Sequence, residues 1–209
     1  DSKIKEIINH YNNIDSRVKY VSSQFGDKIL SYKKKALDAG IKHAMYDYLL
    51  FTDVSCRLSK EWVSTMMHEY NYNADYVIGL SIVPNGKKIV SKFQKIDLMM
   101  LMLTAISATK SGFPLASSGQ NQSYKKDLFL SVGGFNKIAN LIQGDDTIFL
   151  QICNADQPIN INICTNNNSF VQSKLHSNWV PFLRQRIRWA GDGNMMWRYN
   201  KFLYSILVI

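Results

Sequence analysis

Cysteine is scarce in this chain of 209 residues, which has three cysteines and no Cys-x-x-Cys pair. An odd and widely spaced set argues against a disulfide framework and matches no zinc site. We therefore expect free, buried thiols at Cys56, Cys153 and Cys164, as is usual in a reducing compartment. The four histidines are also scattered, without the spacing of metal ligands.

Long hydrophobic runs are missing as well. A transmembrane helix needs roughly 20 consecutive apolar residues. The apolar segment 98–103 is too short, so we expect it to contact the core or a partner. The final run, 202–209, is at most the beginning of such a helix. The chain opens at Asp1 without a signal peptide, and we expect a fragment of a longer protein that lacks both ends.

Several catalytic signatures are absent: a Ser-His-Asp arrangement, a Walker phosphate loop and a GxGxxG fingerprint. Acidic side chains are outnumbered, with 16 Asp and Glu against 25 Lys and Arg, for a formal charge of +9. This balance favours acidic partners such as phosphates, nucleic acid or anionic lipid, although a basic soluble surface explains it equally well. Hydrophobic residues make up 46%, which indicates one large globular domain and excludes a disordered chain.

Helical and strand-like patterns alternate along the chain. The run 48–52 is apolar throughout, which is typical of strands buried on both faces. This βαβ alternation predicts an open, mainly parallel α/β sheet flanked by helices. Helices are expected at 4–11, 36–44, 61–70, 89–109, 146–152 and 179–199, and strands at 17–21, 48–52, 75–83 and 159–164, with strand plus loop over 115–135.

Asp53 stands where the strand 48–52 ends. Ligands of open α/β sheets bind beyond the carboxyl ends of strands, so this carboxylate can hold a metal or a ribose. Mg²⁺ or Mn²⁺ prefers hard oxygen ligands, and Ser55 is the other candidate close by. The structural alternative is that Asp53 caps the following turn or helix.

Asp145 and Asp146 follow Gly144 at the start of an expected helix. Two adjacent carboxylates there can simply complement the helix dipole. The functional interpretation makes Asp146 a general base, because crowding with Asp145 favours proton uptake by one of them. The residues alone leave both interpretations open.

The helix 179–199 is expected to be amphipathic, and Gln185, Arg188 and Trp189 share one of its faces. An amide, a guanidinium and an indole on one face suit a diphosphate and a ring that stacks. Alternatively, apolar side chains of this helix enter a membrane interface while its arginines meet lipid phosphates. The apolar candidates are Trp179, Leu183 and Trp197.

Together these motifs resemble those of the family 2 glycosyltransferases, in particular the membrane-embedded processive branch that includes cellulose and hyaluronan synthases. The run 185–189, Gln-Arg-Ile-Arg-Trp, is the most specific match, to the family's Q-x-x-R-W. Residues 144–146 are similar to the acidic pair whose second member is the catalytic base, and 50–56 with Trp62 to the D-x-D strand end. Ser55 stands where that motif has an acid.

Two further segments carry the resemblance. Residues 33–41 are similar to the family's K-x-x-A-L-N-x-G helix, although a run of lysines is more often a solvated face. Residues 119–125, followed by Gly133-Gly134-Phe135, resemble the acceptor-side segment. The family's first strand and its nucleotide-contacting aspartate are absent from this chain.

The resemblance implies a single Rossmann-like sheet of the GT-A type that lacks its first strand. Residues 1–178 would form an N-terminally truncated nucleotide-sugar-binding catalytic domain, 179–201 an amphipathic helix, and 202–209 the start of a transmembrane helix. It also implies attachment to a membrane, such as a bacterial inner membrane, through the C-terminal segment, with the catalytic domain on the cytoplasmic side.

The implied activity is inverting transfer of a sugar from a nucleoside-diphosphate-sugar to a hydroxyl of a saccharide or lipid-linked acceptor, in polysaccharide or glycoconjugate synthesis. Asp146, beside Asp145, would be the base, Mg²⁺ or Mn²⁺ would bind Asp53 and Ser55, and nucleic acid is not expected as a partner. A catalytically silent relative that binds nucleotide or partner proteins is the alternative. The expected donor-binding residues are Lys33, Asp53, Gln185, Arg188 and Trp189, and those on the acceptor side are Gly119 and Asn121.

Overall fold

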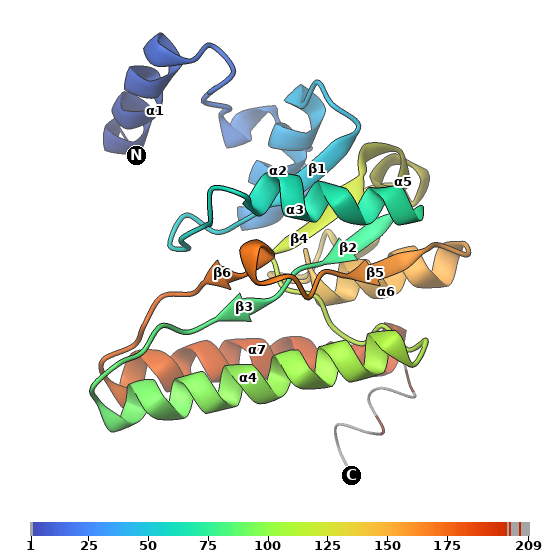
Figure 1. Ribbon diagram of the computed structural model, residues 1–209. Coiled ribbons are helices and arrows are strands. Elements are labelled where there is room, and N and C mark those ends of the chain that lie inside the picture. The colour runs from blue at the N-terminus through green and yellow to red at the C-terminus, as the bar shows by residue number, and fades with distance from the viewer. Residues whose placement is uncertain (1, 200, 202–204, 206–209) are drawn as a thin grey trace. The chain divides into compact units, whose positions relative to one another are not determined.

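The computed structural model describes residues 2–199, 201 and 205, and the chain forms two compact units (Figure 1). The first unit comprises Asp1–Met45 and Phe135–Ile142. The second comprises Tyr46–Gly134 and Gln143–Ile209, and it contains both β-sheets of the described chain. The expected division at residue 178 concerns function and stays a prediction.

The first unit is helical where it is described. Within it, Lys34 on α2 is fully buried, and its Nζ donates a hydrogen bond to the carbonyl of Leu141. The expected strand 17–21 is wrong: the chain there makes a turn, in which the Asp15 carboxylate accepts hydrogen bonds from Arg17. Its elements are α1 (Ser2–Ile14), η1 (Ser23–Phe25), α2 (Tyr32–His43) and η3 (Asn136–Ile138).

The main sheet of the second unit has four strands in the order β1-β4-β2-β5. The β2–β5 ladder is parallel, but β4 runs antiparallel to both of its neighbours, β1 and β2. The α/β class is therefore confirmed, whereas the mainly parallel sheet is not. The strands are β1 (Tyr48–Phe51), β4 (Gln122–Lys125), β2 (Tyr76–Ile78) and β5 (Ile161–Ile163).

A second, two-stranded sheet pairs β3 (Ser81–Ile82) with β6 (Val171–Gln172) in parallel, and Arg57 bridges to Gln172. The sequence predicts one strand over 75–83, but the chain breaks it at Gly79. There the backbone passes so close to Asn121 that a Cβ on residue 79 would lie 2.2 Å from its side chain. The expected single strand is thus two short strands, and residue 79 between them has no room for a side chain.

Helices surround the main sheet, and the two longest, α4 and α7, lie side by side (Figure 1). The sequence predicts both of them to within a residue, but it misses the short α5 that directly follows β4. The helical elements are α3 (Trp62–His68), η2 (Glu69–Tyr72), α4 (Ile89–Lys110), α5 (Lys126–Ser131), α6 (Thr147–Asp156), η4 (Asn167–Ser169) and α7 (Trp179–Tyr199).

None of the helices in the described residues is both long and apolar enough to cross a bilayer. The segment 202–209, expected to begin a transmembrane helix, lies outside the described residues apart from Ser205.

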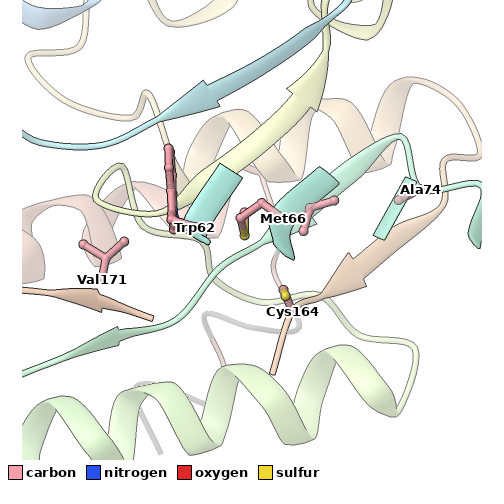
Figure 2. Packing of buried hydrophobic residues seen from close by; sticks show 6 residues of the cluster. Trp62, Met66, Ala74, Cys164 and Val171 are labelled. Atoms are coloured by element: carbon pink, nitrogen blue, oxygen red, sulfur yellow. The ribbon is translucent and has the colours of Figure 1, made fainter. Parts of the chain in front are cut away.

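The core of the second unit lies on both faces of the sheet. On one face, α3 packs Trp62 and Met66 against Val77 of β2 and Cys164, and Cys164 is a free thiol (Figure 2). On the other face, aromatic rings gather around fully buried Tyr124, whose hydroxyl pKa is raised well above its usual range by burial. The rings around it belong to Phe51, Tyr76, Phe129 and Phe149.

Candidate active site

One edge of the main sheet carries several of the predicted residues. Gln122 at the start of β4 lies opposite Phe51, the last residue of β1, and Ile78, the last residue of β2. Since β4 runs against both strands, its amino end shares an edge with their carboxyl ends. Asp53 follows β1 at this edge, and Gly119 precedes β4 there. The topology thus brings the metal-site candidate and the acceptor-side segment to one edge.

Asp146 is fixed beside this edge by its carboxylate. Its Oδ1 accepts a hydrogen bond from the backbone N–H of Thr147 at 2.7 Å, which makes it the N-cap of α6. Its Oδ2 accepts a hydrogen bond from the backbone N–H of Gly119 at 3.1 Å. Asp146 therefore stabilises a helix start, as the structural alternative predicts. The same carboxylate also joins the predicted base to the acceptor-side segment.

A network of buried hydrogen bonds holds the backbone of the acidic pair in place. Gln122, which is fully buried, donates from Nε2 to the backbone carbonyl of Asp145 at 3.0 Å. Its Oε1 accepts hydrogen bonds from the Tyr76 hydroxyl at 2.6 Å and from the Ser117 hydroxyl at 3.0 Å. Burial raises the pKa of Tyr76 well above its usual range, so this hydroxyl keeps its proton and remains a donor.

Thr147 ties the start of α6 to the same segment. Its Oγ1 donates to the carbonyl of Ser117 at 2.8 Å and accepts from the Ser117 N–H at 3.2 Å. Neither Gln122 nor Thr147 stands out in the sequence for this task. A buried glutamine within the central strand β4 is the signal that could have indicated the network, since buried amides require partners.

Asn121 is fully buried, and its side chain forms hydrogen bonds with other groups of the protein. Its Oδ1 accepts a hydrogen bond from Trp62 Nε1 at 3.0 Å. Its Nδ2 donates to the carbonyls of Leu80 and Ser169, both at 2.8 Å. The residue thus fastens α3, the chain after β2 and the chain before β6 to one point. Its predicted place on the acceptor side stays a prediction.

Asp53 lies in a turn after β1, where its backbone carbonyl accepts a hydrogen bond from the Cys56 N–H at 3.0 Å. The side chain of Asp53 is half-buried and that of Ser55 is exposed. Helix α3 begins only at Trp62, so Asp53 does not cap it. No group of three or more His, Cys, Asp or Glu side chains suited to a metal ion occurs in the part of the chain that the structure describes. The chain offers a metal one carboxylate here, with the Ser55 hydroxyl nearby in sequence.

Helix α7 meets the acidic loop through a backbone contact. Gln143, just before Gly144, donates from Nε2 to the carbonyl of Arg188 at 3.2 Å. The loop that carries Asp145 and Asp146 is therefore attached to the helix that carries the Q-x-x-R-W motif. The guanidinium side chain of Arg188 is exposed.

Gln185, Arg186 and Trp189 of the same motif have protein partners. Arg186 forms an ion pair with Asp97 of α4, and its guanidinium lies over the Trp189 ring at 4.3 Å. Burial lowers the pKa of Arg186, and the charge of Asp97 partly offsets that shift. Gln185 forms a hydrogen bond with the His176 side chain, whose pKa burial lowers. Of the three predicted diphosphate ligands on α7, Arg188 thus has the most accessible side chain.

Lys33, the remaining predicted donor-binding residue, belongs to the first unit, where its side chain on α2 is exposed. Its neighbour Lys34 is the buried lysine of that run. The role predicted for Lys33 at the nucleotide stays a prediction.

A polar cavity of about 380 Å³ lies elsewhere in the second unit, beside the amino end of β5. Four asparagines contribute to its wall, and none of the predicted site residues does. The cavity is therefore separate from the edge that carries Asp146.

Comparison with known proteins gives one family match for this chain. Residues 2–205 match the family model described as Glycosyl transferase family 21. No curated protein matches the sequence. The match confirms the general expectation of a glycosyltransferase and corrects the branch, because the resemblance pointed to family 2.

Proposed function

The chain belongs to glycosyl transferase family 21, and from that premise we propose that it transfers a sugar from a nucleoside-diphosphate-sugar to an acceptor hydroxyl, with inversion at the anomeric carbon. The observation that supports this most is the fixed position of the Asp146 carboxylate, held by Gly119 and Thr147 beside the edge where β1 and β2 end. Ligands of open α/β sheets bind beyond such strand ends.

Asp146 is the proposed general base. A carboxylate has about four lone-pair sites, and the backbone hydrogen bonds from Thr147 and Gly119 use one on each oxygen. Asp146 takes the proton of the acceptor hydroxyl while that oxygen attacks the anomeric carbon. The bond to the diphosphate breaks in the same displacement, and the diphosphate leaves with the bonding electrons. Gln122 and Thr147 position the base through their hydrogen bonds to the Asp145 and Ser117 carbonyls.

Arg188 is the proposed partner of the departing diphosphate. Its side chain is exposed on α7, and its backbone is tied to the acidic loop by Gln143. A guanidinium binds phosphate oxygens with paired hydrogen bonds, which strengthen as negative charge builds up on the leaving group. Gln185 and Trp189 of the same helix complete the proposed donor-binding set of the second unit.

A divalent cation fits this site only together with the substrate. Mg²⁺ commonly binds through one or two carboxylates plus substrate phosphates, and the chain offers Asp53, with Ser55 as an accessible second oxygen. Bound there, Mg²⁺ or Mn²⁺ would neutralise charge on the diphosphate. The acceptor proposed is a saccharide or a lipid-linked hydroxyl at the cytoplasmic side of a membrane, with attachment through the C-terminal segment.

The test compares Asp146→Asn with Asp127→Asn in the same chain. Asp127 is an exposed acid in the first turn of α5, outside the proposed site. We expect Asp146→Asn to lower the transfer rate by about 100- to 10,000-fold, with donor binding by calorimetry unchanged. Asp127→Asn should leave both quantities unchanged. Wild-type turnover by Asp146→Asn would show that Asp146 is not the general base.

A catalytically silent relative is the second candidate, and two observations favour it. Asp146 already serves as a helix cap, and Ser55 stands in place of an acid. This alternative predicts that the chain binds a nucleoside diphosphate but consumes no nucleotide-sugar, with or without Mn²⁺. Release of nucleoside diphosphate from any donor, dependent on Asp146, would exclude it.

A further inference from the structure

Helix α4 exposes a continuous apolar stripe on the side opposite the core. Its buried positions include Val90, Gln94 and Leu98, which face the rest of the unit. The outward side chains recur at steps of four and three residues, which places them along one face of a helix. The α4 stripe consists of Ile89, Phe93, Ile96, Met100 and Leu103.

Helix α7 extends this stripe into a broader surface. The Phe93 ring of α4 lies 5.5 Å from the Trp179 ring and 5.7 Å from the Phe182 ring of α7. The Asp97–Arg186 ion pair fastens the same two helices one turn further along, so they run in the same direction. The exposed apolar side chains of α7 are Trp179, Val180, Leu183 and Ile187.

These nine side chains are between 45% and 76% exposed, and we call them the α4–α7 face. Single exposed apolar residues are ordinary, but a contiguous group on two packed helices marks a surface that meets an apolar environment. Figure 1 shows the two helices next to each other, and the ring contacts and the ion pair between them lie in their amino-terminal halves.

Cations border the α4–α7 face on both helices. Three exposed lysines directly precede members of the α4 stripe in the sequence. They are Lys88, which is the N-cap of α4, and Lys92 and Lys95 on the helix. On α7, exposed Arg184 directly follows Leu183. Asp97 is the only acidic residue of α4, and Arg186 neutralises it, while on α7 the side chain of Asp192 lies outside the described ones. The described border of the face is therefore positive.

We propose that the α4–α7 face lies in the interface of a lipid bilayer that contains anionic headgroups, with both helices parallel to the membrane plane. An apolar face bordered by lysine and arginine is the composition of helices that bind this way, because the cations meet the phosphates while the apolar side chains enter the acyl boundary. A second copy of the chain fits poorly, since pairing two such faces brings like charges together. The proposal is independent of sugar transfer.

The test measures binding of the chain to vesicles of phosphatidylcholine alone and of phosphatidylcholine mixed with phosphatidylglycerol. Ile96→Glu and Met100→Glu together should weaken partition into the mixed vesicles by at least about tenfold. The matched control is Leu130→Glu, since Leu130 is 59% exposed but lies on α5. It should bind like the wild type. All variants keep the residues after α7, so any contribution of that segment stays constant.

The electrostatic part has its own variant. Lys92→Glu should weaken binding to the mixed vesicles several-fold, while Lys60→Glu, an exposed lysine outside the two helices, should change it little. Equal circular dichroism spectra and thermal midpoints would establish that the variants are folded. Unchanged partition of the apolar double variant would overturn the proposal. So would a dimer in vesicle-free buffer that the same substitutions dissociate, because the face would then bind a second copy.

Discussion

The backbone N–H of Gly119 donates to the carboxylate of Asp146 at 3.1 Å, which joins two segments 27 residues apart. Gly119 leads into β4, and Asp146 is the N-cap of α6. This bond makes the position of the proposed base depend on the position of β4. The other member of the acidic pair, Asp145, is held through its backbone carbonyl by the side chain of Gln122.

Replacing Gln122 with leucine should misplace the acidic loop. The change removes the hydrogen bond to the Asp145 carbonyl and the nearer of the two acceptors of the Tyr76 hydroxyl, at 2.6 Å, so that only the Ser117 hydroxyl at 3.1 Å remains. We expect kcat for transfer to fall about 10- to 100-fold while KM for the donor stays nearly constant, since misplaced groups weaken the transition state. Tyr70→Phe is the control, because it loses a bond to Ser123 on the opposite face of β4. Equal losses of kcat in both variants would contradict a positioning role.

Asn121→Ala should destabilise the second unit. It leaves the buried indole N–H of Trp62 and the carbonyl of Ser169 without the Asn121 side chain as partner, whereas the carbonyl of Leu80 keeps its hydrogen bond from the Val171 N–H. Buried polar groups that lose a partner destabilise the folded state. We expect the free energy of unfolding, measured by urea denaturation, to fall by about 2–4 kcal/mol. Asn154→Ala changes an exposed asparagine and should alter stability little. A loss below about 0.5 kcal/mol for Asn121→Ala would show that water replaces these bonds.

The Asp97–Arg186 pair should hold α7 against α4. Both side chains are partly buried, so Asp97→Ala leaves a cation with reduced solvation beside two aromatic rings. We expect Asp97→Ala to lower the free energy of unfolding by about 1–2 kcal/mol, which lies between the values typical of exposed and of buried ion pairs. Asp15→Ala breaks the exposed pair with Arg17 and serves as the comparison, measured by thermal unfolding. A larger effect of Asp15→Ala would refute this ranking.

The stability of the chain should fall in mild acid partly because of His176. Burial lowers its pKa, and the charges of Lys174 and Arg186 lower it further, although Gln185 favours the protonated form. The unfolded state therefore binds a proton more readily, so this contribution is complete above the ordinary histidine pKa and is lost as pH falls toward the folded pKa. His176→Asn should flatten the pH dependence of unfolding below neutral pH, relative to the wild type. An unchanged slope would mean that His176 does not titrate in this range.

The two long helices were predictable from the sequence because their apolar residues keep a helical period over many turns. Ile89 and Trp179 each begin a helix at the predicted residue. The antiparallel direction of β4 was not predictable, since strand order depends on contacts across distant parts of the chain. The strand expected around Val18 fails for a related reason: its local pattern has no neighbouring strand to pair with among the described residues.

The candidate site was predicted in part. The acidic pair and the Q-x-x-R-W helix stand out as motifs, and the Gln143–Arg188 hydrogen bond shows that the acidic loop lies beside that helix. The roles predicted for the side chains of both motifs stay predictions. The tasks of Gln122 and Arg186 were not visible, because each depends on a partner far away in the chain. Arg186 in particular sits inside the motif but turns toward α4, which a one-dimensional pattern cannot distinguish from a ligand-facing arginine.

The reversed strand β4 also has a mechanical meaning. Since Gln122 pairs with Phe51 on one side and with Ile78 on the other, any slide of β4 along its axis displaces Gly119 relative to both neighbours at once. The proposed base, bonded to Gly119, therefore keeps its alignment only while β4 keeps its register with both neighbours.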